Sequence, residues 1–187
     1  MRIVGVDDGA FASHGKAKGY APLVAVLFDN LRLLDVTWGR IEVDGRDANI
    51  VLRHLLARMR FDAVMLSGIS FGGFNVVDIA SLSKSVRKPI IAVTGERPRN
   101  QAVSRALREH FTDWRARWSI VRSAGRTHSF APLRSEPRLY FEVRGATPLF
   151  AKQAIASTAV ISRLPEPVRV ARILARGLSG LTQINAP

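Results

Sequence analysis

Short apolar segments separated by polar or glycine-containing turns open the chain, a pattern typical of β-strands. The first segment, Met1–Asp7, is rich in Val and Ile and runs into two carboxylates and a glycine. Residues 20–29 and 32–43 form two longer segments, and Asp29-Asn30 between them is a tight-turn signal. We therefore predict three strands, of which the second and third form an antiparallel hairpin.

Helical spacing begins at residues 44–59, where apolar side chains recur on one stripe. A short buried strand is predicted at 61–66, a second helix at 75–85 and another strand at 90–94. This order predicts an α/β fold with a mixed sheet of five strands flanked by helices. The first three strands are antiparallel, and the first strand is central.

The second half of the chain is more polar. Residues 98–111 predict an amphipathic, basic helix. Residues 118–122 and 139–143 predict a further strand pair, separated by a loop. Two helices follow at 147–161 and 168–177.

Composition limits the class of protein. The 187 residues are 47% hydrophobic, which suits a folded core, and without a repeat or linker we expect one domain over residues 1–187. No run of about eighteen apolar residues is present, so no transmembrane helix is predicted, and no signal peptide is recognisable. A cytoplasmic protein is therefore expected. The absence of cysteine excludes disulfides, thiol catalysis and zinc–thiolate sites.

The net charge is the compositional feature that says most about a binding partner. The chain carries 28 Lys and Arg against 15 Asp and Glu, a net charge of +13, and 23 of its basic residues are arginine. Arginine pairs bidentately with phosphate, so this excess indicates nucleic acid as the partner. Genome composition or thermal adaptation could explain the preference for arginine over lysine, but not the net charge. The arginine-rich run from Arg97 to Arg126 is expected to form a basic face.

Asp7 and Asp8 are the first candidates for chemistry. Strand ends in open α/β sheets face the ligand crevice, and carboxylates there can hold a divalent cation. The simpler interpretation is a strand that ends in an Asp-Gly turn. Asp47 has the same ambiguity, because a carboxylate in or just before the first turn of a helix is favoured by the helix dipole.

Several motifs in this order together resemble endonuclease V, a metal-dependent nuclease family with an RNase H-like fold. They are VGVDDGAF at 4–11, FDAVMLSG at 61–68, KPIIAVTGERPR at 88–99 and LPEPVR at 164–169. The stretch SGISFGGFNVVDI at 67–79 is closer to an uncharacterised, mainly archaeal family related to endonuclease V. The resemblance covers nearly the whole chain and implies the RNase H-like fold.

The resemblance also implies site residues. Asp7 matches the family's catalytic Asp, and Asp47 stands in the place of its Glu, so both are candidates for catalysis and for binding Mg²⁺ or Mn²⁺. Ser67 stands where the family has a second strand-end Asp, and Gln153 falls near its His or Asp. Two metal-binding groups are thereby missing, and the expected cation is weakly held.

The carboxylates of Asp7 and Asp47 are expected to approach one shared cation. Asp8 should turn outward or support the site indirectly. The other candidates are two groups that support the site, Ser67 and Asp78, and three nucleic-acid-binding residues, Arg97, Arg99 and Lys152.

Three functional classes remain open. The first is a Mg²⁺- or Mn²⁺-dependent endonuclease on RNA or DNA, for which Asp7 and Asp47 argue. The second is a catalytically inactive nucleic-acid-binding or ribonucleoprotein-associated protein on a nuclease fold, for which Ser67 and Gln153 argue. The third is a basic interaction protein without a nucleic-acid role.

Overall fold

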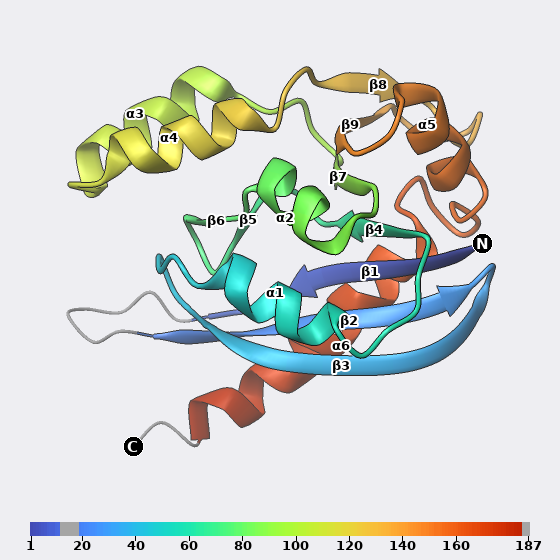
Figure 1. Cartoon of the computed structure of the whole chain (residues 1–187), viewed down its shortest axis with the longest axis horizontal. Coiled ribbons are helices and arrows are strands. Elements are labelled where there is room, and N and C mark those ends of the chain that lie inside the picture. The colour runs from blue at the N-terminus through green and yellow to red at the C-terminus, as the bar shows by residue number, and fades with distance from the viewer. Residues whose placement is uncertain (12–18, 185–187) are drawn as a thin grey trace.

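The computed structural model describes residues 1–11 and 19–184 and confirms the three-stranded start (Figure 1). Strand β1 (Arg2–Asp8) pairs antiparallel with β2 (Tyr20–Asp29), which pairs antiparallel with β3 (Arg32–Glu42). The hairpin turns at Asn30, whose positive φ of 53° an Asn tolerates. The apolar segments and the turn signal therefore predicted this part of the sheet correctly.

The sheet has seven strands in the order β3-β2-β1-β4-β7-β9-β8, not five. Strand β1 is interior, and it pairs in parallel with β4 (Ala63–Leu66), which pairs in parallel with β7 (Ile90–Thr94). Strands β1, β2, β3, β4 and β7 are the five strands predicted within residues 1–94. Two further strands from the second half of the chain, β9 (Leu139–Arg144) and β8 (His128–Phe130), extend the sheet antiparallel. A separate ribbon joins β5 (Ser70–Phe71) to β6 (Asn75–Val76).

The predicted strand at 118–122 is wrong. It lies in helix α4 (Trp114–Ser123), which forms a hairpin with α3 (Asn100–His110). Arg117 on α4 fixes this hairpin, because its buried guanidinium donates to the carbonyl oxygens of Asp44, Gly45 and Phe74 at 2.6–2.9 Å. These hydrogen bonds override the strand preference of the Trp, Ile and Val side chains in that segment.

Helices cover both faces of the sheet (Figure 1). On one face, α1 (Ala48–Leu56) and α2 (Ile79–Val86) pack on a core that includes the even-numbered β1 residues Val4 and Val6. The odd-numbered Ile3 belongs to the core of the opposite face, where α5 (Pro148–Ala156) and α6 (Glu166–Ile184) pack. None of the helices in the described part of the chain is long and apolar enough to cross a membrane.

Helix α6 is longer than the predicted 168–177 and lies directly against β1. Gly5 allows this approach, since a Cβ at this position would overlap the backbone and ring of Pro167 in the first turn of α6. The helix then runs past the carboxyl end of β1, where the predicted site begins.

Candidate functional site

Asp7 lies at the carboxyl end of β1 and is only 4% exposed. Its Oδ1 accepts the backbone N–H of Asp8 at 2.9 Å, and its Oδ2 accepts Nε of Arg172 at 2.7 Å. Arg172 comes from α6 and also donates Nη2 to Ser67 Oγ at 2.9 Å. One guanidinium therefore joins the ends of the adjacent parallel strands β1 and β4.

Asp8 is the next residue along β1, so its side chain points to the other face of the sheet. Its Oδ2 accepts the backbone N–H of Gly72 at 2.6 Å. Burial, and to a lesser extent the charge of Asp7, raise the pKa of Asp8 to about 6, although the Gly72 hydrogen bond opposes this shift. A carboxyl group that titrates near neutrality can accept or donate a proton under physiological conditions.

Asp47 occupies the N-cap position of α1, as the sequence indicated, but its side chain does not cap the helix. Instead its carboxylate accepts Nδ2 of Asn75 at 2.5 Å and the backbone N–H of Glu42 at 3.2 and 3.3 Å. Asp47 thus ties the end of β3 to β6, whereas Asp7 binds Arg172. The two residues are held in different networks, so their approach to one cation stays a prediction.

The other predicted residues are spread over the molecule. Asp78 caps α2, accepting the N–H groups of Ala80 and Ser81. Arg97 and Arg99 are exposed in the loop after β7. Two further candidates, Lys152 and Gln153, lie on α5, and Gln153 is exposed. The pKa of His128 is lowered by burial and, to a lesser extent, by the charges of Arg126 and Lys152.

As arranged, these groups do not fit a divalent cation. Among the residues that the structure describes, no group of three or more His, Asp or Glu could hold a metal ion. Both oxygens of Asp7 already have donors: Oδ2 is bound to the positively charged Arg172, and Oδ1 accepts the backbone N–H of Asp8. Mg²⁺ or Mn²⁺ would therefore have to compete with a guanidinium that belongs to the protein itself.

Two cavities lie at the carboxyl ends of β4 and β7, and both are lined by Ser67 and Thr94. The first, the arginine cavity, has a volume of about 250 Å³. Its lining also includes Val93, Gly95, Leu139, Arg163, Leu164 and Arg172. The second, the glutamate cavity, has a volume of about 300 Å³ and reaches under the α3–α4 hairpin. Its other lining residues include Gly68, Ile69, Asn100, Val103, Val121, Thr127 and Glu142.

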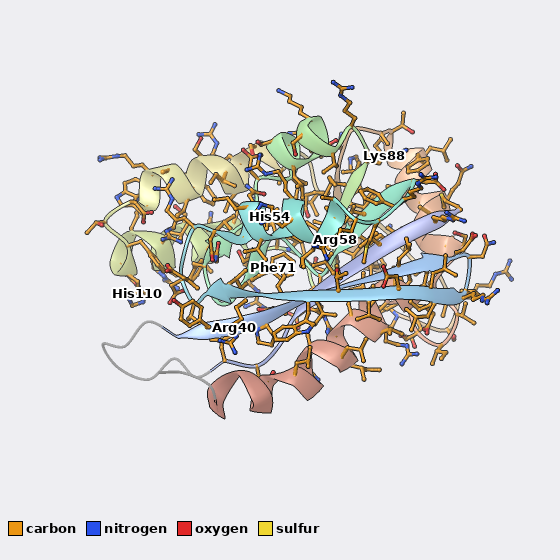
Figure 2. All side chains as sticks on the ribbon, turned by 60° about the horizontal axis from the view of Figure 1, so that its bottom comes forward. Arg40, His54, Arg58, Phe71, Lys88 and His110 are labelled. Atoms are coloured by element: carbon orange, nitrogen blue, oxygen red, sulfur yellow. The ribbon has the colours of Figure 1, made fainter. Side chains whose placement is uncertain are left out.

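Basic side chains are not confined to these cavities. Figure 2 shows Arg40 on β3, Arg58 after α1 and Lys88 before β7, all with exposed side chains on different elements. The net charge therefore provides a general attraction for polyanions, and a specific site has to be located by its shape and contacts.

Sequence reasoning missed the three side chains that define the cavities. Arg172 and Arg163 flank the LPEPVR motif, but the sequence does not reveal which residues they face. Glu142 had a visible signal, because it is a lone carboxylate inside the otherwise apolar segment LYFEV. A charged residue in a buried strand is rare unless it has a partner or a function.

Comparison with known proteins identifies relatives of this chain. A family model described as "Endonuclease dU" matches residues 1–179. A UPF0215 protein of Methanothermobacter thermautotrophicus is 35% identical over 184 residues, which cover 96% of this chain and 88% of the relative. A UPF0215 protein of Thermococcus sibiricus is 34% identical over 180 residues, covering 94% and 90%.

Solved structures agree with the fold. A protein of unknown function from Archaeoglobus fulgidus superposes with a TM-score of 0.80 at 26% identity, covering 93% of this chain and 95% of that one. Endonuclease V of Bacillus subtilis gives a TM-score of 0.66 at 12% identity, covering 99% and 83%. Ciona intestinalis endonuclease V, in complex with a DNA 24-mer that contains an inosine followed by a ribo-adenosine, gives 0.58 at 11%, covering 98% and 87%. The chain therefore belongs to the endonuclease dU family and has the RNase H-like fold of endonuclease V.

Proposed function

We propose that this protein binds DNA containing deoxyuridine at the carboxyl ends of β1, β4 and β7 and cleaves the backbone beside that nucleotide. The observation that carries the proposal is the arginine cavity, where Arg163 and Arg172 converge beside Ser67. Guanidinium groups at a strand-end crevice suit a phosphate of the bound backbone.

The family description supports deoxyuridine as the nucleotide that is recognised. The structural neighbour that holds inosine-containing DNA supports a substrate with a deaminated base, because hypoxanthine and uracil both arise by loss of an amino group. The net charge of +13 supports a nucleic acid over a small molecule.

A second candidate is recognition without cleavage, and the ion pair between Arg172 and Asp7 favours it. Asp7 would be open to Mg²⁺ or Mn²⁺, which would supply the Lewis acid for cleavage, only without its pair with Arg172. If Arg172 instead remains in place, its guanidinium contributes phosphate binding only. Cleavage is therefore expected to be slow, whereas DNA binding does not require the Asp7–Arg172 pair to separate.

The test uses a labelled single-stranded oligonucleotide with one deoxyuridine, and the same sequence with thymidine as control. Binding is measured in EDTA, and nicking is measured after Mn²⁺ is added. We expect tighter binding to the deoxyuridine strand and slow nicking that Asp7→Asn abolishes without reducing binding. Preferential binding without nicking would select the second candidate. Equal binding to the two strands would contradict both.

A further inference from the structure

The glutamate cavity contains a buried carboxyl group that pairs with no cation among the described residues. Glu142 lies on β9 and is 6% exposed. Its Oε1 accepts the hydroxyl of Thr127 at 2.6 Å. Among the residues that the structure describes, no other side chain donates a hydrogen bond to Glu142, and no cation pairs with it. A carboxylate can accept about four hydrogen bonds, so Glu142 keeps acceptor capacity for a ligand in the cavity.

Burying the carboxylate of Glu142 costs desolvation free energy when no ligand binds to it. Burial raises the pKa of Glu142, while hydrogen bonds from Thr127 and from the backbone of Glu142 itself partly oppose the shift. A buried carboxyl with few donors around it is stabilised by a further hydrogen-bond donor. The cavity walls limit the kind of donor, because Ile69, Val103 and Val121 offer apolar surfaces suited to a flat ring.

We propose that the glutamate cavity takes a nucleobase extruded from the strand, and that Glu142 accepts the ring N–H that distinguishes a deaminated base from the amino-bearing base it derives from. Cytosine presents a bare acceptor nitrogen at position 3, whereas uracil presents N3–H. Adenine and hypoxanthine differ in the same way at N1. A carboxylate binds the N–H of the deaminated base and repels the lone pair of its parent, so Glu142 is a specificity-determining residue.

The position of the cavity agrees with this role, which rests on the proposed function. Ser67 and Thr94 line both the glutamate cavity and the arginine cavity. A base in the glutamate cavity would therefore place its backbone phosphates near the arginine cavity. Enzymes that act on a damaged nucleotide commonly extrude the base into such a pocket.

The test measures the affinity of the full chain for four single-stranded oligonucleotides that differ at one position: deoxyuridine, deoxycytidine, deoxyinosine or deoxyadenosine. Wild type should prefer each deaminated base over its parent. In Glu142→Gln the hydroxyl of Thr127 orients the amide, so that an NH₂ group faces the base. Both preferences should fall about 10-fold or more.

Two other variants provide controls. Glu96→Gln removes an exposed carboxylate outside the cavity and should leave both preferences unchanged. Val103→Trp fills the cavity from α3 without altering Glu142, and should abolish both preferences while binding to the deoxycytidine strand is retained.

The outcomes separate this inference from the proposed function. If wild type prefers deaminated bases and a folded Glu142→Gln keeps the full preference, the role of Glu142 is refuted and the proposed function stands. If wild type prefers neither deoxyuridine nor deoxyinosine, both fail. Circular dichroism establishes that each variant is folded.

Discussion

Arg172→Ala is the most informative single change, because it removes the cation that the protein places on Asp7. Asp7 has a side chain that is 6% exposed, so it would be left buried without its partner. Breaking a fully buried ion pair costs about 3–5 kcal/mol, but the Arg172 side chain is 40% exposed and solvent weakens the pair. We therefore expect a loss of about 2 kcal/mol in the free energy of unfolding.

Urea unfolding with and without Mn²⁺ measures the contribution of the Asp7–Arg172 ion pair to stability and the competition between Arg172 and the metal for Asp7. Without metal, Asp7→Asn combined with Arg172→Ala should be more stable than Arg172→Ala alone, since no uncompensated charge is buried. With Mn²⁺ at about ten times its Kd, Arg172→Ala should regain about 1.4 kcal/mol, and wild type should gain much less. Arg176→Ala, an exposed change on the same helix, is the matched control.

Two results would refute this reasoning. Unchanged stability of Arg172→Ala would mean that the ion pair contributes nothing to the fold. An equal response of wild type and Arg172→Ala to Mn²⁺ would mean that Arg172 does not compete with metal at Asp7.

Three further predictions concern pH, salt and the helix hairpin. The pKa of Asp8 is raised to about 6 in the folded state, so its stabilising contribution is full below its ordinary value of 3.8 and is lost as pH rises through about 6. Relative to Asp8→Asn, wild type should be less stable at pH 7 than at pH 4 in urea unfolding, and an unchanged difference would contradict the shift. Arg97→Ala with Arg99→Ala should reduce the slope of log affinity against log salt by about one for each phosphate that the variant no longer neutralises, and an unaltered slope would exclude both arginines from the interface. Arg117→Ala should lower the free energy of unfolding by about 3 kcal/mol, because it leaves three carbonyl oxygens without their donor, while the exposed Arg115→Ala should change it by less than about 0.5 kcal/mol.

Local sequence signals predicted the five strands of residues 1–94 in the main sheet because these strands and turns follow one another along the chain. They missed the β5–β6 ribbon, and the predicted helix at 75–85 begins only at Ile79 because residues 75–76 form β6. The hairpin at Asn30 and the helix start at Asp47 depend on neighbouring residues. Helix α4 was missed because Trp118–Arg122 favours a strand by composition, and the hydrogen bonds of Arg117 that hold it as a helix reach residues 43 to 73 positions away.

The site was predicted less completely for the same reason. The strand end at Asp7 was visible in the sequence, but its partner Arg172 lies 165 positions further along. The placement of Gln153 near the site gains no support, since its side chain is exposed on α5, and the C-terminal residue that reaches Asp7 is Arg172. Only the folded chain shows that Ser67 accepts a hydrogen bond from Arg172.

The central claim is that the strand ends form a specific nucleic-acid site and that general positive charge alone does not explain binding. Arg163 lines the arginine cavity, whereas Arg58 is exposed after α1 and outside both cavities. Each change to Ala removes one charge, so a comparison of the two at equal salt separates the site from the background field. Affinity for the deoxyuridine strand should fall about 10-fold in Arg163→Ala and less than about 2-fold in Arg58→Ala. Equal losses in the two variants would contradict the account.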